Sequence, residues 1–176
     1  MSQTQLQMQN DNKRTLETVN PTTGNVYKKY FLHDEDDAKD IADKAHHAFL
    51  SWRNTSFEER AEIIVKVAAI LERDKTELAE MMARQMGKPV AQGEGEIDLC
   101  IGIAKYTAEQ GPKVLKNEER DLEGGQKGII TYQPLGVILG MQPWNFPFYQ
   151  YIRYSLAVIM GGNTTVFKHA GLCFER

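Results

Sequence analysis

Apolar side chains recur at helical spacing through the first two thirds of the chain. The first such segment follows an acidic run at 34–37 and has apolar residues at positions 38, 41, 45, 48, 49 and 52. This period of about 3.6 residues predicts a helix. Acids in its first turn interact favourably with the positive end of the helix dipole, so helix-start chemistry explains the acidic run better than a metal site does.

Two further helices are expected downstream. Ser56 and Glu59 have the spacing of a capping box, and the apolar stripe behind them predicts one helix of about seven turns. This helix should end at the Met-Gly-Lys-Pro of 86–89, because glycine suits the position after a helix and proline cannot continue its hydrogen-bond ladder. The next helix is expected from Gln92 to about Glu109, with its end at Gly111-Pro112.

Two hairpins flank these helices. Turn residues at 20–25 precede the extended run Val26–Leu32, which predicts a hairpin-like start. A second hairpin is predicted over Val114–Gln133, where a charged stretch and a Gly124-Gly125 turn lead into the β-rich run Ile129–Gln133.

The last part of the chain has the pattern strand, loop, helix, strand. The apolar run Val137–Gly140 is followed by a loop up to Pro147, a helical pattern over Phe148–Met160 and a β-branched run at Thr164–Phe167. Two strands joined by a helix pair in parallel, with the helix lying on the sheet. The expected fold class is therefore α/β. Since two parallel strands do not make a stable sheet, the domain is expected to be incomplete.

Composition adds limits to this picture. The 176 residues are 41% hydrophobic with a net charge of −3, so neither nucleic acid nor an anionic membrane is an expected partner. The longest apolar stretch is far shorter than the roughly 20 residues that span a bilayer. Two cysteines cannot make a disulfide framework, so reduced thiols in a soluble, cytoplasmic protein are expected. The Gln- and Asn-rich residues 1–14 should be a disordered arm.

Several chemistry-bearing residues form no recognisable site. His46 and His47 are adjacent and diverge on a helix, while His33 and His169 are isolated, so no metal site is expected. The glycines of 93–98, GEGEID, follow no strand and lack a third glycine, so they do not make a phosphate loop.

The loop 140–147, GMQPWNFP, is the most distinctive segment. Its two prolines fix their own φ and hold the preceding residues extended, which makes the loop stiff. Asn145 follows the first strand of the βαβ unit and precedes its helix, where open α/β sheets place their ligands. Its amide can donate hydrogen bonds to a developing negative charge. The alternative is that Asn145 only caps the helix or forms an Asx-turn.

These residues resemble the aldehyde dehydrogenase superfamily. The resemblance rests on PLGVILGMQPWNFP at 134–147, on an arginine eight positions after the asparagine, and on GGNTTVFKHA at 161–170. It covers the chain from Asp34 to its end. The KHA ending is similar to the succinate-semialdehyde dehydrogenase branch of the family.

The resemblance implies a Rossmann-like NAD(P)-binding domain, a catalytic domain and a β-hairpin oligomerisation element, so a homo-oligomer formed through the hairpin is expected. The chain then divides into the N-terminal strands and helices of the cofactor domain at 15–112, the hairpin element at 113–134 and the start of the Rossmann-like unit at 135–176.

The resemblance also implies roles for individual residues. Asn145 matches the asparagine whose carboxamide stabilises the oxyanion formed when a catalytic thiolate adds to the aldehyde. Lys168 matches a lysine that hydrogen-bonds the adenosine ribose of NAD or NADP; otherwise it is a solvated charge at a strand end. Gly171 stands where many NAD-preferring relatives have a glutamate, so NADP is not excluded. The segment against the nicotinamide and its ribose matches Met141, Gln142, Pro143 and Trp144.

The implied substrate is a small aldehyde. Phe146, Tyr149 and Gln150 match positions that line the aldehyde tunnel. Arg153 matches an arginine that pairs with the distal carboxylate in succinate-semialdehyde dehydrogenases, and a guanidinium can grip a carboxylate bidentately. The alternative is a surface arginine on the polar side of its helix.

The family's catalytic cysteine and the glutamate that activates water match no residue of this chain. Cys173 has no context that lowers a thiol pKa, so it is expected to be structural. The implied function is the N-terminal part of an NAD(P)-dependent aldehyde dehydrogenase, without turnover by itself. The alternative is an inactive product that acts only as an assembly or binding module.

Overall fold

The computed structural model describes residues 14–173. Its helices are α2 Glu35–Trp52, α3 Phe57–Arg73, α4 Lys75–Met86, α5 Val90–Val114 and α6 Pro147–Met160, with a short 3-10 turn η1 at Glu123–Gly125. Its strands are β1 Thr15–Val19, β2 Val26–Phe31, β3 Glu118–Asp121, β4 Lys127–Ile130, β5 Val137–Met141 and β6 Thr164–Lys168. The expectation of a disordered arm falls on residues that lie outside this range, apart from Arg14, whose carbonyl accepts a hydrogen bond from Leu32 N at 2.8 Å.

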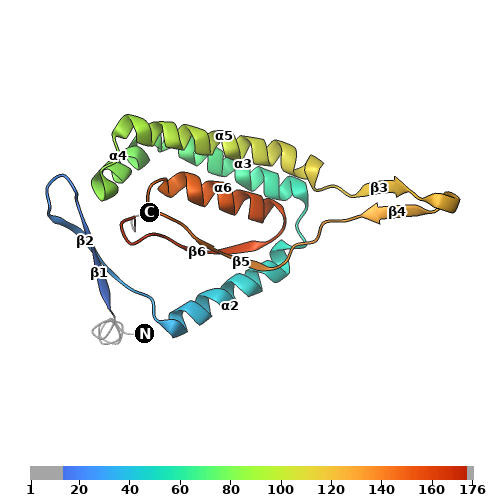
Figure 1. Cartoon of the computed structure of the whole chain (residues 1–176), viewed down its shortest axis with the longest axis horizontal. Helices are drawn as coiled ribbons and strands as arrows, with labels where there is room; N and C mark the ends of the chain where they lie inside the picture. Colours follow the sequence, from blue (N-terminus) through green and yellow to red (C-terminus); the bar gives the residue numbers. More distant parts are fainter. Residues whose placement is uncertain (1–13, 174–176) are drawn as a thin grey trace.

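The expected βαβ unit is confirmed. Strands β5 and β6 pair in parallel, from Val137 opposite Thr164 to Met141 opposite Lys168. Figure 1 shows α6 on one side of this pair and α2 on the other, with α3, α4 and α5 packed beyond α6. The hydroxyl of Thr164 donates to the Ala45 carbonyl at 2.9 Å and ties β6 to α2.

Helix α5 lies at the centre of the hydrophobic core, between α3, α4 and α6. Apart from Glu96, its buried residues are small or β-branched, which lets three helices approach it closely. The core residues are Ile64, Ala68, Leu71, Ala79, Met82, Ile97, Cys100, Ile101, Ala104, Ala108, Ile152, Leu156 and Met160.

The single long helix expected behind Ser56 is wrong, because the chain breaks at Asp74 into α3 and α4. Asp74 has φ −100° and ψ 10°, and its carboxylate pairs with the Arg73 guanidinium at 2.6 Å. Aspartate is a poor helix-interior residue because its short polar side chain competes for nearby groups. The apolar stripe continues across the break. The predicted end at Gly87 is confirmed, with φ 76°.

The expected end of α5 at Gly111-Pro112 is also wrong, since the helix continues through both residues to Val114. Gly111 serves packing here and does not end the helix. A Cβ built on Gly111 would lie 2.4 Å from Met160 Cγ, so a larger residue would force the buried Met160 side chain to move.

Replacing Gly111 with alanine should therefore destabilise the chain, by about 1–3 kcal/mol, because an extra carbon is forced into a filled core. The matched control is Gly102→Ala in the same helix, where an added Cβ meets nothing within 4 Å. That change should stabilise the chain by about 0.5–1 kcal/mol. Urea unfolding of both variants checks the pair, and equal effects of the same sign would contradict this packing.

Both predicted hairpins are present. Strands β1 and β2 pair antiparallel, and so do β3 and β4, from Glu118 opposite Ile130 to Asp121 opposite Lys127. The second turn contains Gly124 and Gly125, with φ of 76° and 74°. The strand expected to reach Gln133 ends at Ile130 instead, because β3 offers no partner residue beyond Glu118. Figure 1 shows this hairpin projecting away from the helices.

Candidate cofactor and substrate site

The residues predicted to contact the cofactor lie together at the carboxyl ends of β5 and β6. Met141 is opposite Lys168 in the strand register, and the next amide, Gln142 N, donates to the Lys168 carbonyl at 3.3 Å. Met141 and Lys168 are both exposed. Farther along, the Cys173 thiol contacts the Trp144 carbonyl at 3.7 Å, which brings the turn containing exposed Gly171 beside the loop. Such strand ends are where α/β sheets bind nucleotides.

The start of α6 does not use Asn145 as a cap. Phe146 is the N-cap residue, and it makes no side-chain capping hydrogen bond. A carboxylate from α5 takes this role, because Glu96 Oε1 accepts from Phe148 N at 2.8 Å and from Tyr149 N at 2.9 Å. The alternative that Asn145 caps this helix is therefore wrong. Asn145 is exposed.

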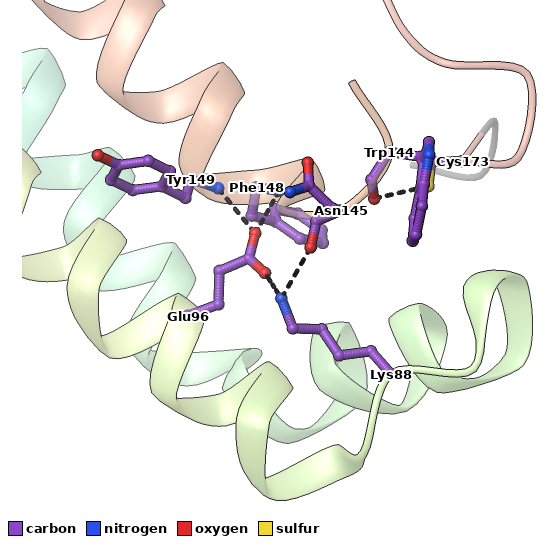
Figure 2. A network of polar contacts seen from close by, with 7 residues as sticks. All are labelled: Lys88, Glu96, Trp144, Asn145, Phe148, Tyr149 and Cys173. Carbon is purple, nitrogen blue, oxygen red and sulfur yellow. Dashed lines mark hydrogen bonds and ion pairs between the residues drawn. The ribbon is translucent and has the colours of Figure 1, made fainter. Parts of the chain in front are cut away.

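Glu96 belongs to a buried ion pair with Lys88, shown in Figure 2. The two side chains are 0% and 7% exposed, respectively. The Lys88 ammonium also donates to the Asn145 carbonyl at 3.2 Å and lies 3.9 Å from the centre of the Phe146 ring. Lys88 thus contacts two neighbouring loop residues, the backbone of Asn145 and the ring of Phe146.

The sequence pattern did not predict this ion pair, although it contained a signal for Glu96. Glu96 lies between Gly93 and Cys100 at helical spacing on the apolar side of α5, where a carboxylate is unexpected unless it has a partner. Lys88 gives no comparable signal, because it follows Gly87 in a connection between two helices.

The residues predicted to contact the aldehyde are the N-cap residue of α6 and residues of its first two turns. The rings of Phe146 and Tyr149 meet edge to face with centroids 6.1 Å apart, and Arg153 Cζ lies 5.7 Å from the centre of the Tyr149 ring. Spacings of three and four residues place these side chains on one side of the helix. Gln150 is half-buried beside them, and Arg153 is exposed. Within residues 14–173, no carboxylate forms an ion pair with Arg153.

Helix α6 is held at points other than its capped start. The Tyr154 hydroxyl donates to the Ile138 carbonyl and fixes the helix on β5, and burial raises the pKa of that phenol. At the other end, the buried Arg60 side chain donates to the Met160 carbonyl at 3.0 Å, where a cation also suits the helix dipole. The loop thus enters a helix that packing and hydrogen bonds hold in place.

Neither cysteine has the properties of a nucleophile. Cys100 and Cys173 are free thiols and both are buried. Burial is the main cause that raises their pKa values, to about 12 and about 11, so both stay protonated at neutral pH.

Metal sites and membrane-spanning helices were both sought in residues 14–173. These residues contain no group of three His, Cys, Asp or Glu side chains suited to a metal ion, and none of their helices is long and apolar enough to cross a membrane.

A comparison with protein families agrees with this arrangement, in which a proline-bracketed loop joins the first strand of a βαβ unit to its helix. A sequence profile described as the aldehyde dehydrogenase family matches residues 8–173. The chain belongs to the aldehyde dehydrogenase family. The match begins well before Asp34, so the similarity extends further toward the N-terminus than the motifs had indicated.

Among individual aldehyde dehydrogenases, the chain is similar to succinate-semialdehyde dehydrogenases. The chain is 35% identical over 153 residues to a probable NADP(+) succinate-semialdehyde dehydrogenase of Synechocystis sp., covering 87% of this chain and 34% of that protein. It is also 35% identical over 153 residues to the NAD(P)+ succinate semialdehyde dehydrogenase Sad of Escherichia coli, covering 87% and 33%. The chain thus spans about a third of the length of these aldehyde dehydrogenases.

Solved structures agree with the fold. The succinic semialdehyde dehydrogenase of Streptococcus pyogenes, crystallised in complex with NADP+ as the cofactor, superposes with a TM-score of 0.85 at 34% identity. The superposition covers 90% of this chain and 35% of that enzyme. The expected fold class, an incomplete α/β domain of the aldehyde dehydrogenase kind, is confirmed.

Proposed function

We propose that this chain is the part of an aldehyde dehydrogenase that holds the cofactor and the aldehyde, and that its substrate is a small aldehyde with a distal carboxylate, such as succinate semialdehyde. The observation that carries the proposal is the path of one loop. It runs from Met141, beside Lys168, through exposed Asn145 to the helix that presents Tyr149 and Arg153.

The strand ends fit NADP or NAD. Lys168 is exposed at the end of β6, where its ammonium can hydrogen-bond a ribose hydroxyl, and Met141 to Trp144 offer a stiff surface for the nicotinamide half. Gly171 is exposed and brings no carboxylate that would repel a ribose phosphate. When bound, the cofactor supplies the acceptor for the hydride that leaves the substrate carbon.

Asn145 suits the role of an oxyanion donor. When a thiolate adds to the aldehyde, a sulfur–carbon bond forms and the carbonyl π electrons move to oxygen, which becomes negative. A carboxamide on a stiff loop can donate N–H groups to that oxygen without reorganising. Since Cys100 and Cys173 are buried and protonated, the thiolate must come from outside residues 14–173. Arg153 is exposed and suits a distal carboxylate.

The first test uses the chain as it is. Purified chain, succinate semialdehyde and either NADP or NAD should give no reduced cofactor, because neither thiol can act as the nucleophile. A chimera in which residues 14–173 replace the corresponding segment of the Streptococcus pyogenes enzyme should form NADPH from the same aldehyde. Turnover by the chain alone, or a folded chimera without turnover, would contradict the proposed function.

A second candidate function, an assembly module, is favoured by the β3–β4 hairpin. This hairpin projects from the body and leaves Leu122, Ile129 and Ile130 exposed (Figure 1). We expect these side chains to pair with a second copy of the chain, which buries them. Size-exclusion chromatography with light scattering should show an oligomer that the double variant Ile129→Ser/Ile130→Ser shifts toward monomer. A monomeric parent chain would contradict this role.

A further inference from the structure

We infer that Lys88 and Glu96 are positioning residues for the reaction, and that they set the place of the Asn145 carboxamide by fixing the Asn145 carbonyl and the backbone that follows it. This inference rests on the proposed function, since it assigns a task to residues that act only through Asn145. Neither side chain belongs to the residues that the loop motif predicts. Both side chains nevertheless make hydrogen bonds to the backbone of this loop or of the first turn of α6.

Burying the Lys88–Glu96 ion pair costs free energy. Two ionised groups that are 7% and 0% exposed have lost most of their hydration, which only good geometry and further hydrogen bonds offset. Glu96 and Lys88 use their remaining hydrogen-bonding capacity on one segment. Glu96 accepts from the amides of Phe148 and Tyr149, while Lys88 donates to the carbonyl of Asn145.

The groups that Lys88 and Glu96 contact are close together in the sequence. Lys88 holds the carbonyl of Asn145 and the ring of Phe146, and Glu96 holds the two amides just beyond Pro147. Figure 2 shows the lysine ammonium between the carboxylate and the loop. The Trp144 carbonyl, on the other side, contacts the Cys173 thiol. Every backbone group that these side chains hold lies within a few residues of Asn145.

The Asn145 side chain itself is not used to hold the loop or to cap α6. The Asn145 side chain is on an exposed residue, and α6 is capped without it. A carboxamide that has no capping duty and is attached to a fixed backbone is pre-organised to donate to a substrate oxygen. Displacing such a group by about 1 Å can cost as much as 100-fold in rate.

The structural part is tested on the whole 176-residue chain by amide hydrogen exchange. Glu96→Ala should raise exchange at Phe148 and Tyr149 about tenfold or more, because both amides lose their acceptor. The matched control is Lys75→Met, which removes an exposed pair with Asp98 that also joins α4 to α5 at 3.1 Å. It should leave both amides unchanged. Unchanged exchange in Glu96→Ala would overturn the inference.

The catalytic part is tested in the chimera by a double-mutant cycle. Lys88→Met should lower kcat about 10- to 100-fold with little change in KM for succinate semialdehyde. In an Asn145→Ala background the same change should cost nothing more, because the group that Lys88 positions is already gone. Equal losses in both backgrounds would overturn the inference and leave the proposed function intact. A parent-like kcat in Asn145→Ala alone would instead overturn the proposed function.

A paired variant separates positioning from folding. Lys88→Met alone leaves a buried carboxylate without its partner, which is strongly destabilising. Lys88→Met/Glu96→Gln removes both charges and keeps an acceptor oxygen for the start of α6, so it should fold and still show the full loss of kcat. Recovery of the parent kcat in this variant, or loss of its fold by circular dichroism, would overturn the local role.

Discussion

Replacing Asn145 with alanine in the chimera is expected to lower kcat for succinate semialdehyde about 100- to 1000-fold. In the proposed role the carboxamide donates to an oxygen that becomes negative only as the thiolate adds, so its contribution should appear in the transition state and not in substrate binding. KM for NADP should change little, because the proposed cofactor contacts are at the strand ends and do not include this amide.

Initial rates at saturating aldehyde and cofactor measure this effect. Asn25→Ala, in the exposed turn between β1 and β2, is the control that changes the same residue type far from the loop. It should keep the kcat of the parent chimera. A kcat for Asn145→Ala within about threefold of the parent would remove the oxyanion role from this residue, since loss of one such donor costs far more.

Replacing Arg153 with methionine should lower kcat/KM for succinate semialdehyde about 10- to 100-fold, since a hydrogen bond to a charged group contributes about 1.5–3 kcal/mol. The loss should not extend to a neutral aldehyde of the same length. Within residues 14–173 no carboxylate pairs with Arg153, so its guanidinium is free for a substrate. Arg153→Lys should be intermediate, because an ammonium cannot reproduce the two parallel hydrogen bonds.

The ratio of kcat/KM for the charged and the neutral aldehyde is the relevant measurement, because it cancels general damage to the fold. Arg120→Met, on the exposed β3–β4 hairpin, should leave the ratio unchanged. If Arg153→Met lowered kcat/KM equally for both aldehydes, Arg153 would have no part in carboxylate recognition.

Local signals in the sequence predicted much of the fold. The capping box of Ser56 and Glu59 is formed with both of its hydrogen bonds, and Asp34 caps α2 in the same way. The strand, loop, helix, strand pattern gave the βαβ unit with ends that differ by one residue. These features depend on neighbours in the chain, so spacing alone can reveal them.

The features that sequence missed depend on contacts between distant residues. The sequence Gly111-Pro112 is typical of a helix end, but in the structure Gly111 packs against Met160 and Pro112 lies inside α5. The break at Asp74 is hidden because the apolar stripe passes through it. Lys88 and Glu96 act on a loop that lies about 50 residues further along the chain, and no local spacing encodes that approach.

The candidate site was predicted only in part for the same reason. The proline-bracketed loop and its place between a strand and a helix follow from local chemistry, whereas the structure adds the exposure of Asn145. The roles of Lys168, Gly171 and Arg153 came from the resemblance to the family, and the structure adds their neighbours. Met141 lies opposite Lys168, and Arg153 lies near the Tyr149 ring.

A crystal structure of the chimera with NADP+ bound tests the central claim most directly, because it asks whether this loop and these strand ends hold the cofactor. We expect the Lys168 ammonium within hydrogen-bond distance of the adenosine ribose, the nicotinamide half against Met141 to Trp144, and the Asn145 carboxamide facing the position of the aldehyde oxygen. Cofactor bound away from the carboxyl ends of β5 and β6, with Asn145 turned from it, would contradict the account.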